Sequence, residues 1–454
     1  MVVTAQRART SLAIAAASAT IVGALLLRPR SGSDCCTNVQ SEIIQARLTS
    51  QKILGGEQDI AVTIRMPGER AHARPPLSLA IVIDRSGSME GKPLANAKAA
   101  ATRLVDELEA RDAFTIITYS SGVEIVVPIT RATAAGKNAA RAAIEQIYDE
   151  GNTCISCGIE AAANELTRTP LGNGVRRMVL ISDGQANSGL YDRNELAQLA
   201  TETASRGMSI STVGVGLDFD EVTMTRLADV AHGHYYFVED TERLSEMFAT
   251  ELGGLAQTVA TGVSLVIMPM PGVVIEDAYG YPVTRTRPGD RQLPDGVSVV
   301  TVPIADLRAG ETRKVVLRAT LPSNVGALQV ARFTLDWRTT SGDARTARTD
   351  LATTIVTDSA EVSASIDREA INIVEQARSA RVLEQATITY EQQGYEAAQK
   401  VLERNMRDVR EKNLDAPAMQ AIERANEAAM DNFAKAPAPK AMKATRADAY
   451  KLAR

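Results

Sequence analysis

Histidine, tryptophan and cysteine are scarce in this chain of 454 residues, which contains 3 His, 1 Trp and 4 Cys. So few imidazole groups argue against a His-rich metal site, and a single Trp argues against a stacked aromatic platform for sugars. Lys and Arg together number 50 against 55 Asp and Glu, and the resulting net charge of -5 excludes a dedicated nucleic-acid binder. An apolar fraction of 45% and a charged fraction of 23% exclude a collagen, a coiled-coil rod and a wholly disordered chain. The length predicts several soluble globular domains.

The N-terminal segment has the pattern of a membrane-targeting sequence. Two arginines precede an uncharged run over residues 11–27, and two more follow it. The run is intermediate in length between the core of a signal peptide and the shortest membrane-spanning helix, so cleavage and retention both stay open. In either case we expect residues 1–36 to export or anchor the protein and to provide its contact with the membrane. The remaining chain would then face the periplasm or the cell exterior.

From residue 76 to about residue 256 the sequence alternates apolar strands with amphipathic helices. The segments over 77–83 and 178–182 are almost continuously apolar, which is typical of parallel strands buried on both faces. This alternation predicts an α/β domain of Rossmann-like type, with a mostly parallel sheet covered by helices on both faces. The predicted strands are 77–83, 114–119, 123–129, 178–182, 208–215 and 235–238, and the predicted helices are 93–109, 191–206, 220–231 and 241–255. Ligands bind at the carboxyl ends of the strands in such sheets, so the residues that follow each strand are the first candidates for a site.

Carboxylate and hydroxyl side chains follow two of these strands and also occupy a loop between them. Asp84, Ser86 and Ser88 stand at alternate positions directly after the first strand. Asp183 follows the fourth predicted strand, and Thr153 lies in a loop between the two. Oxygen donors with two negative charges, and without thiolates or imidazoles, suit a hard divalent cation such as Mg²⁺. Asp and Ser are also common helix caps, but capping does not explain why three separate segments carry the same oxygen chemistry.

The arrangement of these residues resembles the metal-ion-dependent adhesion site of the von Willebrand factor A (VWA) domain. The resemblance rests on Asp-x-Ser-x-Ser within residues 80–89, on the later lone Thr, and on Asp-Gly within residues 179–184. It covers about residues 76–256, and a motif of three separated parts in a strand–loop–helix context is specific.

The resemblance implies a role for each of the five residues. In the VWA family the Ser and Thr hydroxyls contact the metal, the Asp residues often act through water, and an acidic side chain of a partner protein completes the coordination. Carried over, Ser86, Ser88 and Thr153 bind Mg²⁺ or Ca²⁺ directly, and Asp84 and Asp183 mainly balance its charge. The implied partner is a protein that offers an Asp or Glu side chain.

Catalytic arrangements are weaker explanations of the same residues. A phosphatase with an aspartyl nucleophile normally has a second Asp where this chain has Ser86. A nucleophilic serine needs a general base, and among the three histidines we predict that the 232–234 stretch, His-Gly-His, is a turn. We therefore expect no catalytic residues and a non-enzymatic protein. A metal-dependent hydrolase that uses the same cation, and a structural scaffold of the envelope, are the alternatives.

The four cysteines form two close pairs, Cys35-Cys36 and Cys154-x-x-Cys157. A Cys-x-x-Cys at a helix start suits redox chemistry, and it also suits half of a zinc site. In an oxidising compartment structural disulfides are the simpler interpretation. We expect Cys35 and Cys36 to be tied to Cys154 and Cys157.

Short strands flank the α/β domain on both sides. Residues 60–66, 315–321 and 333–337 alternate apolar and polar side chains, and Gly, Pro and Asp mark turns between such strands. This pattern predicts an antiparallel β-sandwich. Because two strands are not stable alone, we expect 37–75 to pair with 257–357, with the α/β domain inserted between them. The layout resembles bacterial envelope VWA proteins and the inter-alpha-trypsin inhibitor heavy chains.

The C-terminal part is rich in Ala, Glu and Gln from residue 358 to residue 434. It predicts a helical segment that docks on the sandwich, with helices near 366–393, 395–412 and 416–434. The last residues, 435–454, are basic and contain two prolines, so we expect a solvated disordered tail. Contact of this tail with anionic lipid or cell-wall polymer is the alternative.

Overall fold

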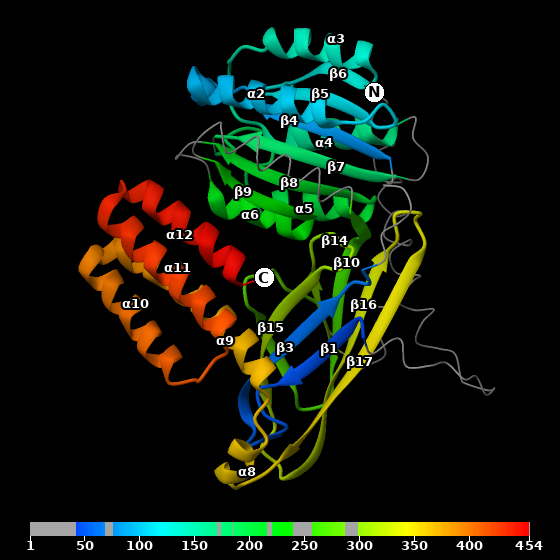
Figure 1. The fold of residues 1–454 in the computed structure, drawn as a ribbon. Helices are drawn as coiled ribbons and strands as arrows, with labels where there is room; N and C mark the ends of the chain where they lie inside the picture. Colours follow the sequence, from blue (N-terminus) through cyan, green and yellow to red (C-terminus); the bar gives the residue numbers. More distant parts are fainter. Residues whose placement is uncertain are drawn as a thin grey trace, which may run out of the picture.

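The computed structural model contains two β-sheets of a sandwich, a separate α/β sheet and a bundle of C-terminal helices (Figure 1). It describes residues 42–68, 76–169, 174–183, 185–215, 220–238, 257–286 and 298–453. The α/β part lies at one end of the sandwich, and the helices lie beside both (Figure 1). The predicted fold class, an α/β domain inserted in a β-sandwich and followed by helices, is confirmed.

The α/β sheet has six strands in the order β6-β5-β4-β7-β8-β9. Its strands are parallel except for β6, which pairs antiparallel with β5 at one edge. Every residue of the central strand β4 is buried, which explains its nearly unbroken apolar sequence. The strands are β4 (Leu77–Asp84), β5 (Ala113–Tyr119), β6 (Val123–Arg131), β7 (Val175–Ser182), β8 (Met208–Val215) and β9 (His232–Val238).

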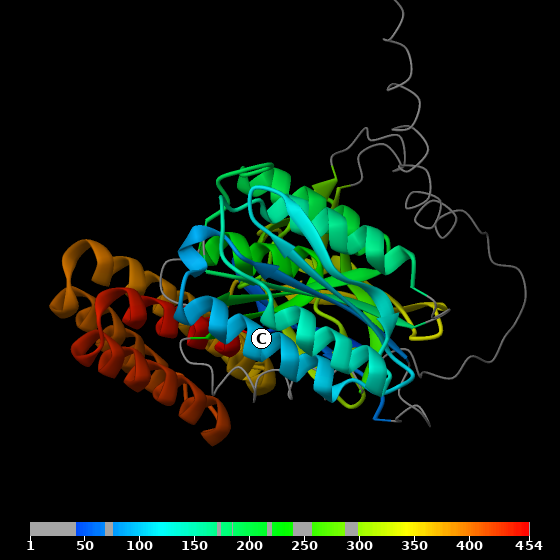
Figure 2. The same cartoon turned by 90° about the horizontal axis from the view of Figure 1, so that it is seen from above.

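Helices cover both faces of this sheet (Figure 2). One face packs against α2 (Lys92–Glu107) and α3 (Ala134–Glu145), and the latter was not among the predicted helices. The other face packs against α4 (Ile155–Thr167), α5 (Arg193–Ser205) and α6 (Glu221–Val230). The predicted helix over 241–255 lies outside the described residues.

The prediction of a turn at 232–234 is wrong, because these residues begin strand β9. Contacts with the sandwich and with β8 hold them there. His232 has a φ of 58°, which is unusual for a residue other than glycine. Its backbone oxygen accepts a hydrogen bond from Asp306 N of the sandwich at 3.0 Å, and this contact helps to hold the residue in that conformation. Gly233 then passes so close to β8 that an added Cβ would lie 2.0 Å from the carbonyl oxygen of Ile210. The glycine therefore permits a close strand contact.

The sandwich combines strands from both sides of the α/β domain. Its smaller sheet has the order β1-β3-β15-β11, and its larger sheet has the order β12-β13-β10-β16-β17-β2, with β14 paired to β10. The antiparallel pairing of β3 with β15 runs from Arg65 opposite Thr312 to Gly56 opposite Leu321, and apolar side chains of the two sheets form one core. The strands are β1 (Ile44–Leu48), β2 (Lys52–Ile53), β3 (Gly56–Arg65), β10 (Thr258–Pro269), β11 (Val274–Ala278), β12 (Thr284–Thr286), β13 (Val299–Pro303), β14 (Leu307–Arg308), β15 (Thr312–Leu321), β16 (Gly326–Arg338) and β17 (Ala344–Ile355).

The C-terminal helices pack on the sandwich and also on the α/β domain. Helix α9 contacts β3 and β15, whereas α12 contacts β9. No helix in the described part of the chain is both long enough and apolar enough to cross a membrane. The helices are α8 (Ser359–Ala364), α9 (Arg368–Gln393), α10 (Tyr395–Arg410), α11 (Ala416–Lys435) and α12 (Ala438–Leu452).

Helix α12 corrects the prediction of a disordered tail over 435–454. A proline in its first turn is compatible with a helix start. Arg446 then forms an ion pair with Glu221 of α6 at 3.2 Å, and Tyr450 donates a hydrogen bond to Asp229 at 3.1 Å. Contacts with acidic groups of another domain order this basic segment, and its composition alone does not reveal them.

Candidate metal site

The two aspartates of the predicted site lie at the same edge of the α/β sheet. Asp84 is the last residue of β4, and Asp183 directly follows β7, the parallel neighbour of β4. Both side chains are enclosed, with exposed fractions of 0% for Asp84 and 7% for Asp183. Parallel pairing of two strands therefore brings together carboxylates that are far apart in the sequence.

Three hydrogen bonds hold the Asp84 carboxylate. Its Oδ1 accepts from Ser86 N at 2.9 Å, and its Oδ2 accepts from Ser182 Oγ at 2.6 Å and from Tyr119 OH at 3.4 Å. Burial nevertheless raises the pKa of Asp84, against the opposing effect of these hydrogen bonds. Burial, together with the charge of Asp84, also raises the pKa of Tyr119 well above its usual range. The Asp84 carboxylate is thus a fixed group whose negative charge is only partly compensated by its surroundings.

Ser86 and Ser88 connect the two aspartates. Ser86 Oγ and Ser88 Oγ are 3.2 Å apart, and Ser88 Oγ donates a hydrogen bond to Asp183 Oδ1 at 2.8 Å. Ser86 is buried and Ser88 is exposed, so this chain of oxygens runs from the protein interior to the surface. The structure brings together four of the five predicted site residues through this chain.

Thr153 lies in a loop that backbone hydrogen bonds attach to the Asp84 loop. Gly87 N donates to Gly151 O at 3.1 Å, and Glu150 N donates to Arg85 O at 2.6 Å. The Thr153 side chain is only 3% exposed, and in the described part of the chain its hydroxyl makes no hydrogen bond to the other four site residues. The structure therefore places the Thr153 loop beside the site, and the backbone makes the connection.

Several residues that support the site were not singled out from the sequence. Ser182 and Tyr119 both bond to Asp84, and each is the last residue of a strand. Attention to strand ends, beyond acidic and hydroxyl motifs, would have found them. Asn187 accepts a hydrogen bond from Thr153 N at 2.8 Å, and only the tertiary structure identifies this contact.

The donor set fits a hard cation better than a soft one. In the described ranges no three or more His, Cys, Asp and Glu side chains are grouped so that they could hold a metal ion. The five predicted ligands are not a group of this kind, because three of them are hydroxyls and only two are carboxylates. These oxygens are the ligands that Mg²⁺ and Ca²⁺ prefer, so the residues present are compatible with either ion.

A disulfide lies directly beside this site, and it corrects the predicted pairing of the cysteines. Cys154 is bonded to Cys157, so neither is tied to Cys35 or Cys36, which lie outside the described residues. The start of α4 brings the Cα atoms of the bonded pair to 5.3 Å, within the range that a disulfide requires.

Comparisons with known proteins identify the α/β domain. Residues 78–250 match the model of the von Willebrand factor type A domain, so the chain contains a VWA domain, as the sequence motifs indicated. The match covers this domain and not the whole chain. VWA domains commonly have a role in protein interaction or adhesion, and they commonly bind a divalent metal at their adhesion site.

Two relatives match different shares of the chain. The uncharacterized protein YfbK of Escherichia coli is 27% identical over 63% of this chain and 48% of its own length. The human inter-alpha-trypsin inhibitor heavy chain H2 is 26% identical over 39% of this chain and 20% of its own length. The chain thus spans about half the length of YfbK and a fifth of the heavy chain.

Solved structures share the fold over most of the chain. A von Willebrand factor type A protein from Catenulispora acidiphila aligns with a TM-score of 0.69 at 18% identity, covering 91% of this chain and 98% of that one. The ArnB paralog VWA2 from Sulfolobus acidocaldarius aligns with a TM-score of 0.55 at 15% identity, covering 89% and 98%. At such identities the likeness concerns the fold alone.

Proposed function

We propose that this VWA-domain protein is a non-enzymatic, metal-dependent binding protein of the bacterial cell envelope. It would recognise an Asp or Glu side chain of a partner protein through Mg²⁺, or Ca²⁺, held by Asp84, Ser86, Ser88, Thr153 and Asp183. The observation that carries the proposal is the chain of hydrogen bonds that joins Asp84 to the backbone N of Ser86, and the Ser86 hydroxyl through Ser88 to Asp183, at one edge of the sheet.

The chemistry of these residues favours an incoming acid. Two carboxylates balance the charge of a divalent cation, and the hydroxyls of Ser86, Ser88 and Thr153 add neutral ligands. A bound cation supplies a strong local positive charge, to which an outside carboxylate is attracted. Because Ser88 is exposed while Asp84 and Asp183 are buried, a partner would approach from the Ser88 side.

Placement in the envelope is supported by two independent features. Residues 1–36 have the pattern of an export signal or a membrane anchor. The Cys154–Cys157 disulfide is of a kind that persists in oxidising compartments such as the periplasm or the cell surface. No nucleic-acid partner is expected for an acidic chain.

The positions of His232 and His234, the two histidines among the described residues, favour binding over catalysis. Hydrolysis by a metal-bound water usually needs a general base near the cation. His232 begins β9, so it lies at the amino ends of the parallel strands. Asp84 lies at the carboxyl end of β4, on the other side of the sheet along the strand direction. A metal-dependent hydrolase is the second candidate because the same cation could activate water. A scaffold whose cation only rigidifies the loops is the third.

A titration of Mg²⁺ into the metal-free full chain, followed by calorimetry, tests the site. Asp84→Ala should abolish binding, whereas Asp106→Ala on α2, an exposed carboxylate of the same domain, should leave it unchanged. A pull-down from envelope extract should then recover a partner with Mg²⁺, and lose it with a chelator or with Asp84→Ala.

Other outcomes would favour the other candidates. Turnover of phosphate esters or peptides that Asp84→Ala abolishes would favour the hydrolase. Mg²⁺ binding without any effect on partner capture or turnover would favour the scaffold. Identical Mg²⁺ binding by wild type and Asp84→Ala would refute the assignment of the site.

A further inference from the structure

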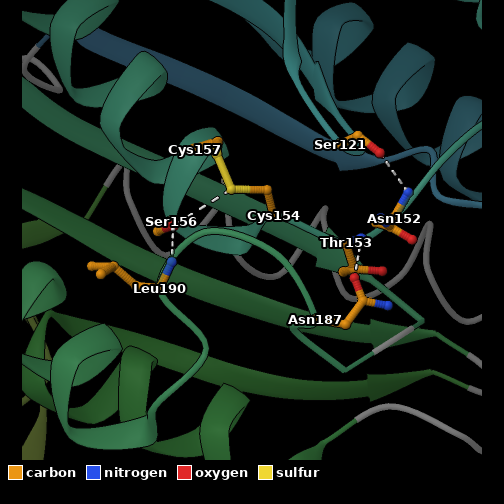
Figure 3. The surroundings of a disulfide bond; sticks show 8 residues. All are labelled: Ser121, Asn152, Thr153, Cys154, Ser156, Cys157, Asn187 and Leu190. Carbon is orange, nitrogen blue, oxygen red and sulfur yellow. Dashed lines mark hydrogen bonds between the residues drawn. A yellow bond between two sulfur atoms is a disulfide. The ribbon is translucent and has the colours of Figure 1, made fainter.

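The Cys154–Cys157 disulfide closes the first turn of α4 immediately after Thr153. Cys154 is the N-cap residue of this helix, and Cys157 is its third residue. The chain therefore passes directly from a proposed metal ligand into a covalent ring of four residues. Figure 3 shows the disulfide, Thr153 and the loop over 187–190 side by side.

The loop over 187–190 binds both Thr153 and the disulfide turn. Asn187 accepts a hydrogen bond from Thr153 N at 2.8 Å through its side chain, and its own backbone N donates to Thr153 O at 3.1 Å. At the other end of the loop, Leu190 N donates to Ser156 Oγ at 3.0 Å. Thr153, the disulfide turn and this loop thus form one hydrogen-bonded unit (Figure 3).

Gly189 packs tightly onto the disulfide from this loop. Its φ is +68°, and an added Cβ would lie 2.4 Å from Cys154 Sγ and 3.5 Å from Cys157 Sγ. Cys154 is fully buried, whereas Cys157 is partly exposed. Cys157 is therefore the more accessible cysteine of the pair to an external thiol.

We propose that Cys157 is a site of thiol–disulfide exchange with an external dithiol, and that opening of the disulfide weakens cation binding at the Thr153 loop. This inference rests on the proposed function and adds its regulation.

The exchange step balances with one equivalent of dithiol. A thiolate of the dithiol attacks Cys157 Sγ, a new S–S bond forms there, and the Cys154–Cys157 bond breaks. Cys154 leaves as a thiolate and takes up a proton. The second thiol of the reductant then attacks the mixed disulfide and releases Cys157, so two electrons and two protons pass to the protein and the dithiol becomes a disulfide.

Packing explains why the open form would affect Thr153. Bonded sulfurs are about 2.0 Å apart, whereas nonbonded heavy atoms require roughly 3.5–4 Å. The buried Cys154 has no room to move toward Gly189, so any movement of its sulfur when the bond opens displaces the 187–190 loop or the Thr153 backbone. Loss of such supporting contacts typically weakens metal binding by about 10-fold to 100-fold.

The test compares Mg²⁺ affinity of the oxidised and reduced full chain by calorimetry. A Cys35→Ser/Cys36→Ser background leaves Cys154 and Cys157 as the remaining cysteines. Dithiothreitol is the reductant, and it is removed under anaerobic conditions before each titration with Mg²⁺. We expect reduction of the folded protein, about tenfold weaker Mg²⁺ binding, and recovery on reoxidation. A Cys154→Ser/Cys157→Ser variant should bind like the reduced protein and should not respond to dithiothreitol.

Two results would overturn the inference and leave the proposed function standing. One is equal affinity of the oxidised and reduced forms. The other is a disulfide that dithiothreitol reduces only after the protein is unfolded, as alkylation and mass spectrometry would detect. If the oxidised protein binds no Mg²⁺ at all, the proposed function and the inference both fail.

Discussion

Arg177 of the VWA domain and Asp306 of the sandwich form a buried ion pair, with Arg177 Nη2 2.7 Å from Asp306 Oδ2 and side chains that are 1% and 3% exposed. Both groups have further partners. Arg177 donates to Ser211 Oγ at 3.1 Å, and Asp306 Oδ1 accepts from the backbone N of Gly262 at 3.1 Å. This pair is one of the contacts that join the inserted domain to the domain that carries it.

Removal of one member of this pair should destabilise the protein strongly. Asp306→Ala leaves a buried guanidinium without its carboxylate, which costs about 3–5 kcal/mol. Asp350→Ala, which breaks the exposed pair with Arg332, should cost less than about 1 kcal/mol. Urea unfolding followed by the fluorescence of Trp337, the one tryptophan of the chain, measures both. Equal losses in the two variants would contradict the importance of burial here.

Thr153→Ala should weaken Mg²⁺ binding without unfolding the domain. Among the described residues its hydroxyl makes no hydrogen bond to the other four proposed ligands, so its removal breaks no contact between them. We expect about tenfold weaker binding in a calorimetric titration, as for other changes around metal ligands. Thr225→Ala on α6 is the matched control, and it should bind like wild type. An unchanged affinity of Thr153→Ala would remove this residue from the ligand set.

Cation binding should weaken as the pH falls. Burial raises the pKa of Asp84 in the metal-free protein, so the folded chain holds this proton more tightly than the unfolded chain does. The stabilising contribution of Asp84 is therefore present at acidic pH and is lost as the pH rises through the raised pKa. A cation requires the ionised carboxylate, so its affinity should increase over the same pH interval.

Asp84→Asn separates these two effects. Without cation, the variant should gain stability relative to wild type as the pH rises, because it carries no buried charge. Thermal unfolding in the presence of a chelator, at a series of pH values, measures this difference. A difference that does not change with pH would mean that Asp84 titrates normally.

Arg446→Ala should weaken the packing of α12 on the VWA domain and lower the free energy of unfolding, by an amount that depends on the protonation of Glu221. Burial raises the pKa of Glu221, and Arg446 opposes this effect. Without the guanidinium, the buried carboxylate loses a charged partner, and we expect a cost of about 1–3 kcal/mol at neutral pH. The raised pKa means that stability is favoured at acidic pH, so the deficit should shrink as Glu221 becomes protonated.

Lys451→Ala provides the comparison for this variant, because Lys451 lies on the same helix and is highly exposed. It should leave stability unchanged within about 0.5 kcal/mol. A deficit of Arg446→Ala that stays constant from acidic to neutral pH would show that Glu221 is not the group responsible.

Much of the site was predictable because the relevant patterns are local. An apolar strand followed by alternating oxygen donors identified Asp84, Ser86 and Ser88, and a second strand end identified Asp183. The supporting contacts of Asn187 were not predictable, because they join loops separated by 34 residues. The histidines at 232–234 were assigned to a turn because neither the hydrogen bond from Asp306 nor the close passage of Gly233 along β8 has a local pattern.

The sequence by itself determined the alternation of strands and helices, the insertion of the α/β domain and the oxygen chemistry of the candidate site. These features follow from hydrophobic periodicity and residue type, which act over short stretches of chain. Only the tertiary structure decided that Cys154 pairs with Cys157, and that the basic residues after 435 form a helix on the VWA domain. Each cysteine has several possible partners, and the basic helix is held by acidic groups of another domain. Composition and spacing therefore leave both outcomes open.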